Sequence, residues 1–286
     1  MSIGLFMVNI KIIFVLCFSF LLTGCSSKFV YNNLDWIIEW YIDDYVQLSA
    51  QQNLLVESRL DVLHQWHRQQ ELIKYRAQLE QLSIDLENLP LDVEYLDTHF
   101  QQIFVHWLTM RKQVSSELAT LAPRLNSEQV NYLFAQLEKR NQQRLEEFKK
   151  QGVIVYNKER QENIEQSLDE YLGSVTELQK YFISYFVRNA HILQKQHVDF
   201  SRTYQQQLKN TFTQKDAQKL SDSLLILLNN SEPFRSPEYN QKLSENRQLA
   251  LNLLHNISES LTAQQIAHFQ HKINDFIKLI NQLIAD

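Results

Sequence analysis

The sequence predicts an all-α fold, an elongated multi-helix bundle with long antiparallel helical hairpins. Helix-breaking residues are scarce, because the 286 residues include only four glycines and four prolines. Apolar residues recur three and four positions apart over long stretches, which is the spacing of one face of a helix. Five short segments have the pattern of a helix start, and no segment predicts a β-strand.

The N-terminus has the layout of a secretory signal peptide. Lys11 precedes the apolar run 12–22, and the small residues of Leu-Thr-Gly-Cys, ending at Cys25, follow it. The run is too short for an ordinary membrane-spanning helix, which needs about 20 apolar residues. An uncleaved N-terminal anchor is the alternative interpretation. The sequence also leaves open whether translation starts at Met1 or at Met7.

The Leu-Thr-Gly-Cys motif resembles the lipobox of bacterial lipoproteins. In that class the cysteine becomes the first residue of the mature protein and carries a diacylglyceryl thioether and an N-acyl chain such as palmitate. The resemblance implies lipid attachment at Cys25, and two or more acyl chains hold a protein stably on a membrane. Ser26, where some lipoproteins have aspartate, implies sorting to the outer membrane, with the protein facing the periplasm.

The signal and the lipid set the expected domain organisation. We expect a signal peptide at 1–24, a short lipidated tether at 25–32, and a helical domain at 33–286. The mature chain keeps 27 of the 28 basic residues, because Lys11 leaves with the signal, and all 33 acidic residues, so its net charge is −6. That balance predicts no nucleic-acid partner. No pattern indicates a cofactor, and no free thiol is left for a disulfide.

The first helix of the mature domain, starting near Leu34, is apolar on nearly all sides. A helix of this kind is ordinarily buried, so we expect it at the centre of the core. The alternative is that Trp36, Trp40 and Tyr41 contact the lipid headgroup region or a partner, since Trp and Tyr favour that interface. One line of acids on this helix should be solvated; it consists of Asp35, Glu39, Asp43 and Asp44.

The five helix starts share one pattern. Each has an apolar residue, then Ser, Thr or Asn, and three residues later Gln or Asp. These residue types at this spacing predict a capping box preceded by a hydrophobic staple. Their irregular intervals exclude a solenoid repeat. The five segments are 48–52, 125–129, 175–179, 212–216 and 261–265.

Proline and glycine mark the remaining boundaries. Pro90 separates two long apolar seams, so we expect an antiparallel helical hairpin with coiled-coil-like packing around it. Gly173 should end a helix in the left-handed conformation. Gly152 is the one indication that the helical domain is subdivided, near residue 152.

Four segments together resemble a family of proteobacterial lipoproteins that share a domain of unknown function. The segments are Tyr31–Trp36, Asp43–Val46, His64–Arg68 and Tyr171–Gln179. Where these proteins usually have Trp-Leu-Gly, this chain has Tyr171. The family carries no established activity, so the resemblance implies a fold and a location and transfers no catalytic residue.

A weaker likeness connects two of the helix starts with small periplasmic chaperones. Leu-Ser-Ala-Gln-Gln at 48–52 and Leu-Thr-Ala-Gln-Gln at 261–265 are similar to the Leu-Thr-x-x-Gln motif of those helical proteins. A capping box with a hydrophobic staple would produce the same letters in any helical protein.

The best candidate metal ligands are two His-x-x-His pairs, His64/His67 and His268/His271, with Asp61, Glu71 and Asp275 each one helical turn from a pair. Each pair shares a helix face and could bind one metal ion together with a third ligand. Surface or half-buried imidazoles without a metal are the interpretation we favour. No nucleophile motif and no phosphate-binding glycine loop is found, so we assign no catalytic residue.

We therefore expect a membrane-anchored periplasmic lipoprotein that is not an enzyme. Its expected role is structural or protein-binding within the cell envelope, with chaperone-like activity as one form of that role. The expected partners are the membrane, through the lipid on Cys25, and a protein or peptide of the envelope. The alternative function is a metal-binding sensor or a metal-dependent hydrolase that uses the His-x-x-His faces.

Overall fold

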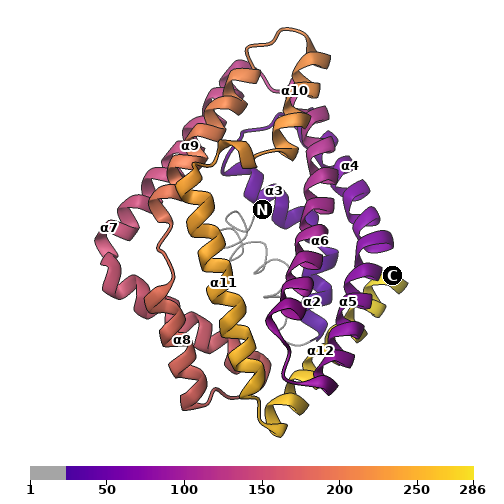
Figure 1. Cartoon of the computed structure of the whole chain (residues 1–286). Coiled ribbons are helices and arrows are strands. Elements are labelled where there is room, and N and C mark those ends of the chain that lie inside the picture. Colours follow the sequence, from indigo (N-terminus) through magenta and orange to yellow (C-terminus); the bar gives the residue numbers. More distant parts are fainter. Residues whose placement is uncertain (1–23) are drawn as a thin grey trace. The chain divides into compact units, whose positions relative to one another are not determined.

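The computed structural model describes residues 24–286, and every regular element among them is helical (Figure 1). The predicted all-α multi-helix bundle is therefore confirmed for this part of the chain. Residues 1–23, which make up most of the predicted signal peptide, lie outside the described residues, as does the side chain of Cys25. From residue 24 onward, no helix is both long enough and apolar enough to cross a membrane.

The helices are labelled in chain order in Figure 1. A π-helical turn at His67–Glu71 joins α4 to α5, so the long predicted helix before Pro90 is interrupted once. The helices are α2 Gly24–Asn32, α3 Leu34–Asp43, α4 Ala50–Trp66, α5 Leu72–Asp85, α6 Val93–Leu121, α7 Ser127–Leu172, α8 Glu177–Asn189, α9 Gln194–Thr211, α10 Ala217–Asn229, α11 Pro237–Glu259 and α12 Ala263–Ala285.

The chain forms two compact units, and each unit is assembled from three separate segments. Helices α6, α7 and α11 each pass from one unit into the other. The passage within α7, between Glu147 and Phe148, lies a few residues before Gly152. The domain bounds expected from the sequence stay predictions. Unit 1 comprises the chain up to His67, 106–147 and 193–240; unit 2 comprises 68–105, 148–192 and 241–286.

Unit 1 is held by an aromatic cluster and by an ion pair between long helices. The rings of Tyr204 and Tyr239 lie 6.0 Å from that of Phe200, between α9 and the start of α11. Arg202 of α9 donates two hydrogen bonds, of 3.0 and 2.6 Å, to the carboxylate of Glu138 on α7. A second apolar cluster contains Ala119, Leu220 and Leu224.

Unit 2 contains the hairpin predicted around Pro90. Gln78 of α5 donates to the backbone oxygen of His99 on α6 at 3.2 Å, and the His99 ring lies 2.8 Å from the carboxylate of Asp85. Helix α12 runs beside α5 (Figure 1), where Arg76 donates to Asn281 at 2.8 Å. The main apolar cluster joins the end of α7 to α8 and α11; it contains Leu172, Ile183, Phe186, Val187, Ala190, Leu253 and Ile257.

Four of the five predicted helix starts are confirmed as capping boxes. In each, the N-cap side chain accepts a bond from the backbone of a glutamine three residues later, and that glutamine side chain accepts from the N-cap backbone. The prediction at Thr213 is wrong, because α10 is capped by Asp216, which accepts from the Gln218 and Lys219 amides. Thr213 instead donates to the backbone oxygen of Asn210 and belongs to the preceding turn. The four confirmed N-cap residues are Ser49, Asn126, Thr176 and Thr262.

In unit 2 the glutamines of two capping boxes also bind each other. The Gln179 amide donates to Gln265 Oε1 at 3.1 Å, and the Gln265 amide donates to Gln179 Oε1 at 2.8 Å. Each amide makes one further bond, Gln179 to the backbone oxygen of Ser260 and Gln265 to that of Ser174. Both glutamines are fully buried. We call this reciprocal pair a glutamine clasp; it ties the first turn of α8 to the first turn of α12.

Unit 1 contains a second glutamine clasp of the same design. Gln52 of α4 donates to Gln129 of α7 at 3.1 Å, and Gln129 donates back at 2.7 Å. Gln52 also donates to the backbone oxygen of Arg124, and Gln129 also donates to that of Gln47, each at 2.7 Å. A motif that caps one helix locally therefore also joins two helices far apart in the sequence.

Two glycines have the left-handed backbone that other residues rarely adopt. Gly173 follows α7 with φ of +76°, as predicted, and a Cβ there would lie 3.0 Å from the ring of His268. Gly152 interrupts α7 with φ of +71°, and a Cβ there would meet nothing within 4 Å. At position 173, both the left-handed backbone and the contact with His268 require glycine. At position 152, only the left-handed backbone requires it.

Candidate functional site

The N-terminal helices expose an apolar face. Phe29 of α2 and Trp36 and Trp40 of α3 are 68%, 69% and 66% exposed. Trp36 and Trp40 lie one turn apart on α3 and share a side of that helix, while Phe29 lies on α2, before the turn at Asn33. The prediction of a central core helix is wrong, because α3 contains no buried residue. We call Phe29, Trp36 and Trp40 the aromatic face.

Tyr41 lies at the edge of this face and is 40% exposed. Its hydroxyl is 3.1 Å from that of Tyr45, which in turn accepts a bond from Arg140 Nε at 3.1 Å. Burial, together with the hydrogen bond to Tyr45, raises the pKa of Tyr41 to about 12, so the phenol is neutral. These bonds fasten the end of α3 to α7 and leave the two tryptophans unconstrained by hydrogen bonds from α7.

Carboxylates flank the aromatic face. Asp35 and Asp43 are exposed, as predicted for a solvated acidic line. Burial and the neighbouring charges of Glu57, Asp35 and Asp43 raise the pKa of Glu39. The local charge is therefore negative, and any affinity of this face for a lipid surface must come from its aromatic rings.

The predicted lipid-attachment residue lies on the same helix as the start of the aromatic face. The backbone of Cys25 belongs to α2, four residues before Phe29. Four residues of α-helix rise by about 6 Å. A lipid on Cys25 would therefore enter the membrane within one helical turn of Phe29, and the stretch expected as a tether is helical.

The first histidine pair links α4 to α2. The ring of His64 lies 4.7 Å from that of Tyr31, and the Tyr31 hydroxyl is 2.9 Å from Nδ1 of His67. Burial, and to a lesser extent the charge of His64, lowers the pKa of His67 to about 4. His67 is therefore a neutral ring that takes part in a structural hydrogen bond.

The second histidine pair is split between two environments. His268 lies against Gly173, with Nε2 3.3 Å from the backbone oxygen of Glu170. His271 is exposed and lies 3.1 Å from Asp275. Between residues 24 and 286, no group of three or more His, Cys, Asp and Glu side chains is arranged to hold a metal ion. In this part of the chain, neither His-x-x-His pair forms a three-ligand group, and Asp275 pairs with His271 alone.

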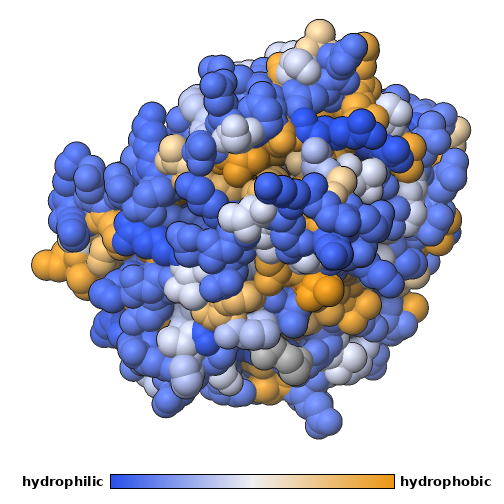
Figure 2. Space-filling view, turned by 90° about the horizontal axis from the view of Figure 1, so that it is seen from above, coloured by the Kyte–Doolittle hydropathy of each residue, from blue (hydrophilic) through white to orange (hydrophobic). Residues whose placement is uncertain are grey.

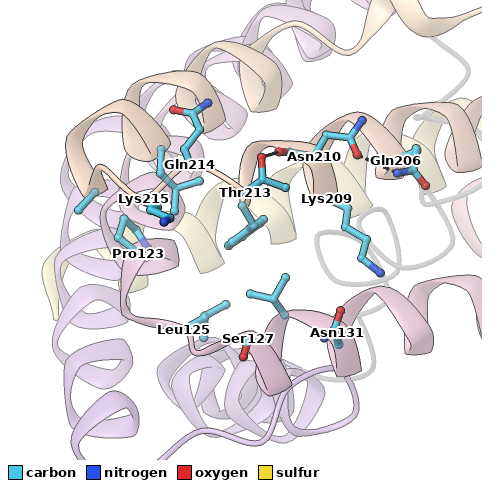
Figure 3. A pocket seen from close by; sticks show the side chains of 14 residues that line it. Pro123, Leu125, Ser127, Asn131, Gln206, Lys209, Asn210, Thr213, Gln214 and Lys215 are labelled. Carbon is cyan, nitrogen blue, oxygen red and sulfur yellow. Dashed lines mark hydrogen bonds between the residues drawn. The ribbon is translucent and has the colours of Figure 1, made fainter.

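A pocket of about 470 Å³ lies within unit 1, between the α6–α7 connection and the α9–α10 connection (Figure 3). Leu125, Val130 and Phe212 contribute apolar surface, and Lys209 extends into the space from α9 (Figure 3). Among the described residues that line it there is no His, Cys, Asp or Glu. The polar side chains of the lining are amides, the hydroxyls of Ser127 and Thr213, and the amines of Lys209 and Lys215.

Residues 44–240 match a family of unknown function, DUF6279. The chain belongs to this family. The predicted domain of unknown function is thereby confirmed. Comparisons with curated proteins and with solved structures gave no match.

The DUF6279 region includes the complete clasp of unit 1, the His64/His67 pair and the pocket, and it leaves out the aromatic face and α12. Of the predicted contact residues, the structure exposes Trp36, Trp40 and Tyr41 together. Phe29 was not among the predicted contact residues, because it lies on α2, in the stretch expected to be a tether.

Proposed function

We propose that this DUF6279 protein is a lipid-anchored lipoprotein on the periplasmic side of the outer membrane, with a non-enzymatic structural or protein-binding role. The exposed aromatic face, which begins four residues after Cys25, carries the proposal. Trp side chains favour the boundary between headgroups and acyl chains. Helix α2 would start at the lipidated cysteine, and α3 with both tryptophans follows α2 directly after the turn at Asn33, which keeps the tryptophans close in the chain to the lipid.

The non-enzymatic part of the proposal rests on how the candidate groups are used. His67 bonds to Tyr31, and His271 pairs with Asp275 at the surface. The four capping glutamines bind one another and backbone groups. Each of these contacts has a structural purpose, and none presents a reactive group to the pocket.

The protein-binding part is supported by a second exposed face, on α8. Leu178, Tyr181 and Tyr185 recur at helical spacing and are each about half exposed. Apolar side chains that gather on one exposed helix face are typical of interaction sites. The Leu-Thr-x-x-Gln letters add no support for a chaperone, because capping and the glutamine clasps account for them.

Lipid attachment is tested by metabolic labelling with palmitate. We expect label on the wild-type protein and on Cys17→Ser, since Cys17 leaves with the signal. Cys25→Ala should carry no label and should leave the membrane fraction, because no acyl chain is left to hold it. An unlabelled wild-type protein that stays in the membrane with its signal intact would show an uncleaved N-terminal anchor instead.

Contact between the aromatic face and lipid is tested by tryptophan fluorescence in vesicles that contain brominated lipids, which quench nearby indoles. We expect partial quenching of the wild-type protein. Trp36→Phe/Trp40→Phe should remove most of that quenching, because the remaining Trp66 and Trp107 are half-buried. Exposed substitutions of this kind change the free energy of unfolding by about 0.5 kcal/mol or less. Equal quenching of both proteins would overturn the contact.

A further inference from the structure

The bend of α7 at Gly152 exposes three consecutive apolar residues. Val153, Ile154 and Val155 are 53%, 85% and 45% exposed, and Ile154 is the most exposed large apolar side chain that the structure describes. In Figure 2, apolar atoms project at the left edge, the side on which α7 bends in Figure 1. The surrounding helix is otherwise polar. We call Val153–Val155 the apolar corner.

The apolar corner is held in place from both sides. The rings of Phe148 and Tyr156 meet edge to face, with centroids 5.3 Å apart, across the bend. Gly152 between them has φ of +71°, which turns the chain at this point. The three side chains are therefore kept in contact with water, which is unfavourable and which a partner surface would remove.

The charges closest to the apolar corner are basic. Lys149 and Lys150 precede it and Lys158 follows it, while the nearest acidic residues, Glu147 and Glu159, lie just outside 148–158. Lys149 and Lys150 are exposed, and neither forms an ion pair with any described residue. Lys158 lies 3.6 Å from Glu162, but both side chains are so exposed that the pair is weak.

We propose that the apolar corner inserts into an anionic phospholipid surface. The lysines would meet the lipid phosphates, and Ile154 with its two neighbours would enter the boundary of the acyl chains. The inference rests on the membrane location proposed above and adds a second, electrostatic contact. The aromatic face cannot supply that contact, because Asp35 and Asp43 flank it. A neutral protein surface would cover the apolar side chains but would leave the lysines without counter-charges.

The test uses the full-length protein, extracted from membranes and reconstituted into vesicles. Ile154→Cys is labelled with a polarity-sensitive fluorophore, and the vesicles contain spin-labelled lipid as quencher. In vesicles with phosphatidylglycerol we expect a blue-shifted label that is quenched about threefold or more strongly than in vesicles of phosphatidylcholine alone. Lys149→Gln/Lys150→Gln should reduce the difference between the two lipids to less than half.

Two controls separate the corner from the rest of the surface. Leu178→Cys, labelled in the same way, reports another exposed apolar side chain of unit 2, whose neighbour Lys180 is paired with Glu177, and should show no lipid dependence. The unsubstituted protein carried through the labelling measures dye bound elsewhere. Equal quenching at Ile154→Cys and Leu178→Cys would mean non-specific adherence and would overturn the proposal.

Flotation of the same samples distinguishes this proposal from the anchor. If the protein floats with the vesicles but the label at Ile154→Cys stays unquenched, insertion of the apolar corner is contradicted, whereas the lipid anchor is still supported. Protein that fails to float, with no quenching, would overturn both. A blue shift that appears without lipid and grows with protein concentration would indicate that the apolar corner contacts a second copy of the chain. That result would also contradict insertion into lipid.

Discussion

Gln179→Ala is expected to lower the free energy of unfolding by about 3 kcal/mol. The substitution removes a capping acceptor, worth about 1 kcal/mol, and leaves buried partners without their bonds, at about 1–3 kcal/mol. The affected groups are the backbone amide of Thr176, the backbone oxygen of Ser260 and the side chain of Gln265, which is fully buried. Urea unfolding followed by circular dichroism measures the change.

A double-mutant cycle tests whether the clasp acts as a unit. Gln179→Ala/Gln265→Ala should be less destabilising than the sum of the two single variants, by about 1–2 kcal/mol, because the second change removes a partner already lost. Gln218→Ala is the matched control, since Gln218 lies in the first turn of α10 but is exposed. The prediction would be contradicted if the changes in the free energy of unfolding of the two clasp variants were strictly additive. It would also be contradicted if each change were as small as that of Gln218→Ala.

Acid should destabilise the protein between about pH 6.5 and pH 4, through His197. This side chain is 4% exposed, and its Nδ1 lies 3.3 Å from the hydroxyl of Tyr239. Burial, followed by the charges of Arg144 and Arg235, lowers the pKa of His197 to about 4. Below about pH 6.5, His197 is protonated in the unfolded chain but stays neutral in the folded chain. The free energy of unfolding therefore falls with decreasing pH.

The size of this effect follows from the difference in pKa. His197 alone should lower the free energy of unfolding by about 2 kcal/mol between pH 7.5 and pH 5 and by about 3 kcal/mol at pH 4. His67, whose pKa is lowered in the same way, adds to it, but its surface is half-buried and solvent screening makes its share smaller. The total makes this the largest change we predict.

Urea unfolding at pH 7.5 and pH 5 measures the acid effect. His197→Gln should lose most of the difference between the two pH values, because an amide does not titrate in this range. His271→Gln should keep it, since His271 is exposed. A wild-type protein whose unfolding free energy is the same at both pH values, or an NMR titration of His197 with a midpoint near 6.5, would contradict the prediction.

Local sequence signals predicted the helices well, because helix starts and ends depend on neighbours within one turn. Ser49, Thr176 and Thr262 cap their helices as predicted, and Gly173 ends α7 in the left-handed conformation. The failure at Thr213 has the same origin, since two candidate caps lay three residues apart and the carboxylate of Asp216 provides the cap. Capping patterns therefore locate a helix start to within one turn.

Burial was harder to predict, because it depends on what packs against a helix. Residues 34–43 are apolar on nearly all sides, a pattern that a core helix and a helix at a lipid interface share. Helix α3 contacts α4 and leaves Trp36 and Trp40 open. Likewise, the spacing of His64 and His67 placed them on one face, but Tyr31 of α2 occupies that face.

By itself, the sequence determined the all-α fold, the positions of most caps, the hairpin at Pro90 and the left-handed Gly173. These features rest on hydrogen bonds and backbone angles within a few residues. Only the tertiary structure decided that capping glutamines pair into two clasps, that the chain passes repeatedly between two units, and that the aromatic face is open. Such features join residues up to about a hundred positions apart, and no local pattern records which distant helix will be the neighbour.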